Sequence, residues 1–290
     1  STGIIGVYLD MKKIGVAATT GCRQLEASVE GFMGAARGIL TTDKSEKIVH
    51  RCIETSQGTV RLTAVAKGAG MIGPNMATML ACVLTDANLA TDDAQCMLVG
   101  SADKSFNCIS VEGHTSTNDT VLLMANGKAN NSCLVGNDLE RFKNEITSAL
   151  IELAQMIPAD GEGATHLMEI TVSGASDDTD ARKVANSVAA SNLVKTCVAG
   201  ADPNWGRIVS AAGYAGVEFN VKDLRLDLNG VRLFADEMPV GFDDAEVSHS
   251  MRNTFVTNID LIIGQGEGRA TIWSSDLTCA YVNFNSDYHT

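Results

Sequence analysis

A threonine that follows a glycine-rich turn has the surroundings best suited to chemistry in this sequence. Residues 67–86 read KGAGMIGPNMATMLACVLTD, and Thr78 stands after the small Ala77 and before an apolar run, residues 79–84. A threonine hydroxyl becomes a nucleophile when a base lies beside it. A free α-amino group on the same residue can be that base, with an ordinary pKa of about 7.7 to 8.0. To free that amine, the chain must cut itself between Ala77 and Thr78.

Two other interpretations of this segment stay open. Gly68, Gly70 and Gly73 have the spacing of a dinucleotide-binding loop, a strand is predicted before them, and acidic residues follow at a suitable distance for a ribose contact. A single match of this kind is weak support. Alternatively, the glycines form an ordinary turn between two strands, and Thr78 is a β-branched strand residue.

The string KGAGMIGPNMATML, followed by TDA at residues 85–87, resembles the self-cleavage segment of the ornithine acetyltransferase family, the bifunctional glutamate N-acetyltransferases. In that family the threonine after the alanine becomes the N-terminus of a β chain and carries the acetyl group. The resemblance therefore implies cleavage between Ala77 and Thr78, with Thr78 as the nucleophile. Gly73 departs from the family pattern, in which histidine or another side chain is expected.

Other short blocks resemble the same family, in the same order along nearly the whole chain. They are STG at residues 1–3, TTD at 41–43, STND at 116–119, DGEGAT at 160–165 and the C-terminal block 273–290. The resemblance implies that Thr2 and Gly3 form an oxyanion hole. It also implies substrate contacts from Thr41, Lys67, Thr78, Glu162, Asn285 and Thr290, and a supporting role for the STND loop. Taken alone, the same residues indicate turns, a helix cap, a solvated lysine and a frayed tail.

Regular elements must position these residues, and the hydrophobic pattern predicts several of them. Apolar residues at helical spacing predict helices over residues 24–40, from a Thr-Asp-Asp cap at 91–93, over 138–157 and over 177–190. Strands are predicted over 59–66, 79–84, 166–174 and 255–263, with hairpin turns at Asn229-Gly230 and at 264–268. This mixture indicates an α+β (mixed α/β) fold, and the resemblance implies stacked β-sheets flanked by helices.

The composition is that of an ordinary globular protein with an excess of acidic residues. The 290 residues are 45% hydrophobic and 20% charged, with a net charge of −13. Nucleic-acid and anionic-membrane surfaces need clustered lysine and arginine, so neither partner is expected. No apolar run approaches the roughly 18 residues of a membrane span. Eight cysteines without a CxxC pair and five histidines predict reduced thiols and no metal site.

The resemblance also implies a reaction and an assembly. Acetyl would pass from N2-acetylornithine to Thr78 and then to glutamate, giving ornithine and N-acetylglutamate of arginine biosynthesis. No cofactor is implied, and acetyl-CoA as a second donor stays open. Residues 1–77 would be the C-terminal part of an α chain and residues 78–290 a β chain, one intertwined catalytic unit that forms an α/β heterodimer and higher oligomers. The family's region ahead of Ser1 is expected to be missing, and the expected compartment is the cytoplasm, or the mitochondrial matrix or a plastid in a eukaryote.

Three alternative functions remain at this point. A self-cleaving aminopeptidase or amidohydrolase with an N-terminal threonine would share the cut but pass the acyl group to water. A dinucleotide-binding domain that uses Gly68, Gly70 and Gly73 would not cut itself. A truncated fragment without catalysis would also stay intact.

Overall fold

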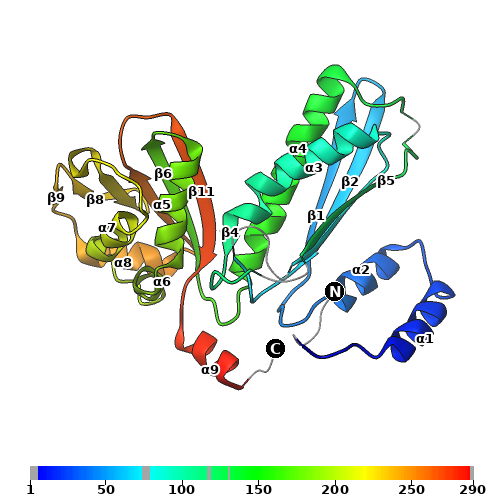
Figure 1. The fold of residues 1–290 in the computed structure, drawn as a ribbon, viewed down its shortest axis with the longest axis horizontal. Coiled ribbons are helices and arrows are strands. Elements are labelled where there is room, and N and C mark those ends of the chain that lie inside the picture. The colour runs from blue at the N-terminus through cyan, green and yellow to red at the C-terminus, as the bar shows by residue number, and fades with distance from the viewer. Residues whose placement is uncertain (1–5, 74–78, 116–118, 130, 288–290) are drawn as a thin grey trace.

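The computed structural model describes residues 6–73, 79–115, 119–129 and 131–287, which form two sheets and the helices around them (Figure 1). The strands are β1 (Lys47–Thr55), β2 (Gly58–Lys67), β3 (Leu80–Thr85), β4 (Ile109–Ser110), β5 (Thr120–Ala125), β6 (Leu167–Ala175), β7 (Arg225–Leu228), β8 (Val231–Ala235), β9 (Met238–Pro239), β10 (Val256–Ile262) and β11 (Gly268–Ser275). The helices are α1 (Met11–Cys22), α2 (Val29–Gly38), α3 (Thr91–Lys104), α4 (Gly136–Ala159), α5 (Asp178–Ala190), α6 (Asn192–Ala199), α7 (Trp205–Gly213), α8 (Asp244–Asn253) and α9 (Cys279–Asp287), with short 3₁₀ turns η1 (Phe106–Cys108) and η2 (Val221–Asp223).

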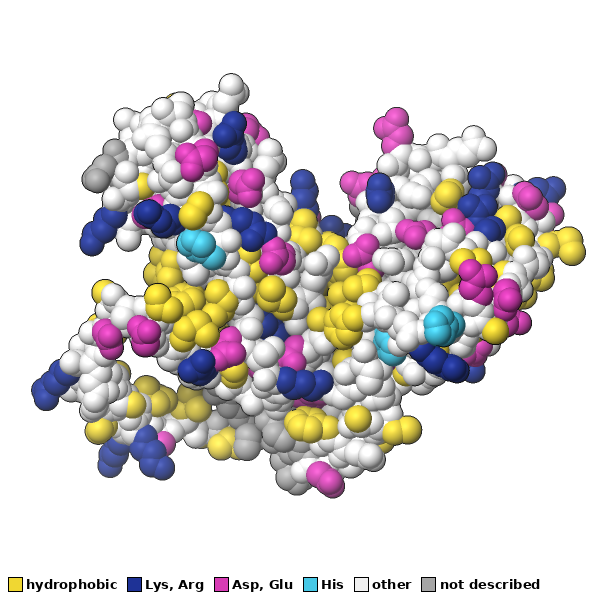
Figure 2. Space-filling view, turned by 180° about the vertical axis from the view of Figure 1, so that it is seen from behind, with side chains coloured by type: hydrophobic (Ala, Val, Ile, Leu, Met, Phe, Trp, Pro, Cys, Tyr) yellow, Lys and Arg dark blue, Asp and Glu magenta, His cyan; other side chains and the backbone are white. Residues whose placement is uncertain are grey.

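A four-stranded sheet has the order β1-β2-β3-β5, with β3 and β5 parallel and the other pairs antiparallel. Alternate residues of β2 are fully buried, among them Val60, Leu62 and Ala64, as expected of a strand with one covered face. Helices α3 and α4 cover that face (Figure 1). On the other face, Leu122 and Met124 of β5 are half exposed. Figure 2, which views the molecule from behind, shows hydrophobic side chains gathered across the middle of that side.

The second sheet has seven strands in the order β4-β11-β6-β10-β7-β8-β9. Helix α5 packs on β6 and β11, and α7 packs on α5. The predicted hairpin at Asn229-Gly230 is confirmed: it joins β7 to β8. Both turn residues have positive φ, 48° and 81°, which is the backbone that an Asn-Gly pair favours in a two-residue hairpin.

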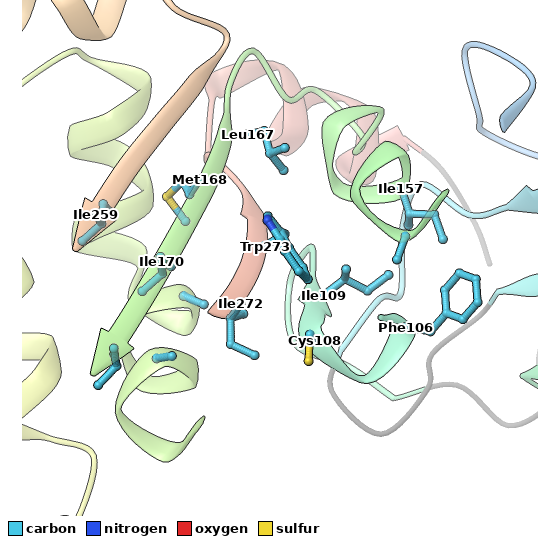
Figure 3. Packing of buried hydrophobic residues seen from close by; sticks show 14 of the residues in the cluster. Phe106, Cys108, Ile109, Ile157, Leu167, Met168, Ile170, Ile259, Ile272 and Trp273 are labelled. Atoms are coloured by element: carbon cyan, nitrogen blue, oxygen red, sulfur yellow. The ribbon is translucent and has the colours of Figure 1, made fainter. Parts of the chain in front are cut away.

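The long helix α4 joins the two sheets through one continuous core. Its predicted apolar face is buried, and it includes Phe142, Ile146, Leu150, Leu153 and Ile157. Figure 3 shows the region where the sheets meet: Trp273 of β11 lies beside Ile109 of β4, with Ile157 and Phe106 beyond it. The expected fold class, mixed α/β with sheets flanked by helices, is therefore confirmed.

One predicted connection is wrong. The glycine-rich segment at residues 264–268 does not turn a hairpin, because β10 and β11 lie on opposite sides of β6 instead of pairing with each other. The segment instead crosses the end of β6 at very close range. A Cβ on Gly266 would lie 1.9 Å from the carbonyl oxygen of Ala175. Glycines are thus needed here for close backbone approach, and that requirement gives the same sequence signal as a hairpin turn.

Two predicted helix starts are also corrected. The helix predicted from residue 24 begins at Val29, where the Ser28 hydroxyl accepts a hydrogen bond from the Gly31 amide at 3.0 Å, while Leu25 is 84% exposed. Helix α3 begins at Thr91, but its N-cap residue is Ala90 and no side chain caps it. Side-chain capping by Ser28 fixes the first boundary later than the apolar spacing alone indicates.

Candidate active site

The glycine loop, residues 68–73, connects the buried end of β2 to the segment that leads into β3. The carbonyl of Ile72 in this loop accepts two hydrogen bonds from residues that follow β4. The amides of Val111 and Gly113 donate to it at 2.9 and 3.1 Å. At the other end, the Gly68 amide donates to Asp43 Oδ1 at 2.6 Å. Ile72 is fully buried. The loop that precedes Thr78 in the sequence is therefore held from both sides.

Gly73, the departure from the family pattern, has a structural reason in this chain. A Cβ at this position would lie 2.6 Å from the carbonyl carbon of Gly113. Real Cβ atoms do not approach backbone so closely, because van der Waals repulsion forbids it. Glycine at position 73 therefore allows the glycine loop to pack directly on the backbone at residue 113.

Glu162 lies against the glycine loop. Its amide donates to Ala69 O at 2.9 Å, and its carboxylate packs on Gly70, where an added Cβ would meet Oε1 at 2.5 Å. The carboxylate accepts hydrogen bonds from Thr42 Oγ1 at 2.8 Å and from Asn285 Nδ2 at 3.0 Å. Two of the predicted site residues, Glu162 and Asn285, are thus in direct contact.

Thr41, the predicted substrate contact, neighbours this cluster. Its amide donates to Asp43 Oδ2 at 3.1 Å, whereas the hydroxyl that reaches Glu162 belongs to Thr42. Sequence reasoning did not single out Thr42. Its position beside Thr41 in the TTD motif was the one available signal, and that signal cannot say which of two adjacent hydroxyls faces the site.

Lys67 is 1% exposed and lies at the end of β2, beside a buried charge network. In that network Lys47 Nζ binds Asp43 Oδ1 at 2.7 Å and Asp160 Oδ2 at 2.6 Å. Burial lowers the pKa of Lys67, and the carboxylates of Asp43 and Asp119 oppose that effect. The structure thus places Lys67 in a buried, charged environment, and its contact with substrate stays a prediction.

Asp119 anchors the residue that follows the predicted nucleophile. Its Oδ1 accepts a hydrogen bond from the Met79 amide at 2.7 Å, and the Thr120 amide donates to Met79 O at 3.2 Å. The start of β5 therefore fixes the chain immediately after Thr78. Asp119 belongs to the STND motif, which was expected to support the nucleophile, but no specific contact of Asp119 was predicted.

Five predicted site residues lie outside the described residues. They are Thr2, Gly3, Ala77, Thr78 and Thr290, and their roles stay predictions. Within the described ranges, no cluster of three or more His, Cys, Asp or Glu side chains could hold a metal ion. No helix in that part of the chain combines the length and the apolar character that crossing a membrane requires.

The dinucleotide-binding interpretation is wrong. That fingerprint places its glycines between a strand and a helix, so that the helix N-terminus meets the phosphates. The segment with Gly68, Gly70 and Gly73 instead joins β2 to β3, which pair antiparallel, Lys67 opposite Leu80. The carboxylate of Glu162 also lies against Gly70, where a phosphate would be repelled.

Comparison with known proteins gives the same family as the sequence motifs. The model of the ArgJ family matches residues 1–290. Proteins named arginine biosynthesis bifunctional protein ArgJ are similar to this chain: that of Rhodopirellula baltica is 44% identical, over all of this chain and 72% of its own length, and that of Lactococcus lactis is 45% identical, over 99% and 72%. The crystal structure of the Bacillus halodurans protein of that name has a TM-score of 0.69 and 38% identity, over 71% of this chain and 98% of its own.

The fold and these relatives define the class, a mixed α/β enzyme of arginine biosynthesis. The chain belongs to the ArgJ family. The predicted family is therefore confirmed.

Proposed function

We propose that this chain is an ornithine acetyltransferase, which moves acetyl from N2-acetylornithine to glutamate through an acetyl-Thr78 intermediate. The observation that carries the proposal is the contact of the glycine loop with Glu162, which brings the segment before Thr78 onto the carboxylate bound by Asn285. Membership of the ArgJ family supports the same reaction. The names of the relatives, which describe bifunctional proteins of arginine biosynthesis, also agree with it.

The chemistry needs two acyl transfers. The Thr78 amine takes the hydroxyl proton while Oγ attacks the acetyl carbonyl, and collapse of the tetrahedral intermediate breaks the amide bond and returns the proton to ornithine. The amine of glutamate then attacks the acetyl ester, and Oγ leaves with a proton. Thr2 and Gly3 would donate hydrogen bonds to the oxyanion in both steps. Threonine thus supplies both the nucleophile and the base, and the reaction as written uses no metal or cofactor.

The self-cleavage step is supported by the position of the proposed cut. It lies between β2 and β3, which are adjacent antiparallel strands joined from Leu62–Thr85 to Lys67–Leu80. The sheet would hold the two pieces together as an α/β heterodimer once the connecting peptide is broken. The length of the Bacillus halodurans chain also agrees with the proposed β chain. Nearly all of that chain matches 71% of this chain, and residues 78–290 make up 73% of this chain (213 of 290). Assembly of such heterodimers into higher oligomers, and work in the cytoplasm or in an organelle, belong to the same proposal.

The intact mass of the denatured protein beside a Thr78→Ala variant tests the cut. We expect pieces of 77 and 213 residues in the wild type and one uncut chain in the variant. A wild-type protein that stays uncut would contradict the proposal.

An assay of the cleaved protein separates the acetyltransferase from the related hydrolase. With N-acetylornithine and glutamate as substrates, we expect equal amounts of ornithine and N-acetylglutamate. Free acetate at the same rate with and without glutamate would instead identify an amidohydrolase. Replacing N-acetylornithine by acetyl-CoA in the same assay tests whether acetyl-CoA is a second donor.

A further inference from the structure

A second carboxyl group, Glu112, also binds the glycine loop. Its Oε1 accepts a hydrogen bond from the Ile72 amide at 2.7 Å, and the Met71 amide is a further donor to the same carboxyl group. Met71 has a positive φ of 56°, an unfavourable backbone for a residue with a side chain. Two amides bound to one carboxyl group help to hold that backbone in place.

The other oxygen of Glu112 is buried, and it has no hydrogen-bond partner among the described residues. Buried polar atoms are nearly always paired, because an unpaired one has lost its hydrogen bonds to water without replacing them. The exception at Glu112 Oε2 lies beside the proposed active site. The Glu162 carboxylate adds to the rise in the pKa of Glu112. Burial raises the pKa of Tyr281 of α9, and Glu112 adds to that rise.

Lys195 of α6 fixes the chain just before this carboxyl group. It is 4% exposed, and its Nζ donates to Val111 O at 2.8 Å, to Ser274 Oγ at 3.0 Å and to Ser275 O. An ammonium group has three donors, so all three are satisfied. Lys195 therefore ties the residue before Glu112 to the end of β11, and the next residue along, Asp276, binds the Thr165 amide at 2.9 Å.

Charge and burial favour a protonated Glu112. Burial raises the pKa of Glu112 to about 7; the Ile72 and Met71 amides and the more distant Lys195 oppose the rise, and the Glu162 carboxylate adds to it. Burial lowers the pKa of Lys195 to about 8, against the attraction of Asp276 and Glu112. Because two carboxylates close together resist carrying two charges, Glu112 keeps its proton below about pH 7.

We propose that Glu112 is a positioning residue of the acetyl-transfer site. One oxygen holds the Met71 and Ile72 amides, and the other keeps a proton, so that Glu112 adds no second negative charge beside Glu162. Lys195 holds the backbone from which Glu112 projects. The inference rests on the proposed function, because the glycine loop positions the residue that would carry the acetyl group.

Two substitutions of Glu112 separate its two roles. Glu112→Gln keeps an acceptor oxygen for the two amides but cannot ionise, whereas Glu112→Ala removes the acceptor. We expect Glu112→Ala to slow self-cleavage and lower kcat/KM by about tenfold or more, the effect of losing hydrogen bonds to a buried donor. Glu267→Gln, on the exposed surface turn after β10, is the matched control and is expected to match the wild type.

The pH profile supplies the readout that a merely structural role would not change. Above about pH 7 the wild-type Glu112 ionises beside Glu162, and the Gln variant does not. The ratio of wild-type to Glu112→Gln kcat/KM should therefore fall between pH 6 and pH 8.5, by up to about tenfold where the pKa of Glu112 is about one unit higher in the transition state than in the free enzyme. Transfer activity of the wild type is measured first, because an inactive wild type contradicts the proposed function itself. An active wild type with a constant ratio, and with Glu112→Ala unimpaired, overturns this inference alone. If Glu112→Ala does not fold, the pH profile of Glu112→Gln decides.

Discussion

Loss of the buried Lys47 charge is expected to lower the stability of the fold. It is 1% exposed and lies between Asp43 and Asp160, at 2.7 and 2.6 Å. Removing one member of a buried ion pair leaves an uncompensated charge, which typically costs about 3–5 kcal/mol. We expect Lys47→Met to lower the free energy of unfolding by that order, measured by urea denaturation. Lys222→Met removes an exposed lysine and should change it by less than about 0.5 kcal/mol. Equal effects in the two variants would show that the network contributes nothing to stability.

The same substitution has a defined effect at acid pH. Burial raises the pKa of Asp43, but the Lys47 ammonium and the Gly68 amide outweigh it, so the pKa lies below its ordinary value of 3.8. A carboxyl group with a lowered folded-state pKa stabilises the protein above pH 3.8, and that stability is lost as the pH falls through the folded-state value. Without Lys47 the pKa of Asp43 rises. We therefore expect the midpoint of acid unfolding to move to higher pH in Lys47→Met, followed by far-ultraviolet circular dichroism.

At the scale of single residues, the sequence predicted the site only in part. Glu162 and Asn285 came from motifs, and the structure brings them together at 3.0 Å. Glu112, which binds the glycine loop, and Asp119, which binds the Met79 amide, had no specific sequence signal as ligands of an amide. Their contacts span about 40 positions of the chain, and a carboxylate that will bind an amide through tertiary contact looks the same in sequence as a solvated one.

The glycine loop as an element can be tested at Gly70. Its φ is not in the left-handed region, so alanine is compatible with the backbone, but its Cβ would lie 2.5 Å from Glu162 Oε1. Because that atom ends a flexible side chain, we expect Gly70→Ala to displace the Glu162 carboxylate and leave the fold intact. Hydrogen bonds to charged groups contribute about 1.5–3 kcal/mol, so KM for N-acetylornithine should rise by about tenfold or more.

Gly100→Ala is the control for the loop variant. Gly100 lies inside α3, and a Cβ there meets nothing within 4 Å. Alanine in a helix interior is favoured over glycine by about 0.5–1 kcal/mol, so this variant should be slightly more stable and fully active. A Gly70→Ala protein with unchanged KM, or one that unfolds, would contradict the argument that the substitution acts through Glu162.

The elements themselves were predictable where one strong pattern governed them. The apolar stripe predicted 138–157 and the structure gives Gly136–Ala159; the strand predicted over 166–174 is Leu167–Ala175. Helices α6 and α7 were not predicted, because residues 191–208 combine a turn signal at Asp202-Pro203-Asn204 with short apolar runs. The order of strands in the seven-stranded sheet could not be predicted from the sequence pattern either. Local glycine signals mark where a chain turns, but they do not show which strand pairs with which.

At the scale of the whole molecule, one helix unites the two sheets. Helix α4 packs on β1 and β2 of the four-stranded sheet and on β4 and β11 of the seven-stranded sheet. The buried hydrophobic residues form one cluster that includes members of both sheets. A shared core is the physical basis for cooperative unfolding. The sequence-based prediction that residues 1–77 and 78–290 form one intertwined unit can therefore be tested as a prediction about cooperativity.

Leu62→Ala in β2 is the substitution for that test, and the amide of Ile170 in β6 is the probe. Leu62 is fully buried in the four-stranded sheet, and replacing a buried leucine by alanine costs about 2–5 kcal/mol. If both sheets open together, the free energy of opening at the Ile170 amide, measured by native-state hydrogen exchange, falls by the same amount. Leu122→Ala, on the half-exposed face of β5, should leave it almost unchanged. An Ile170 amide that exchanges as in the wild type, while the amides of β2 exchange faster, would mean that the sheets unfold independently and that α4 stabilises each of them separately.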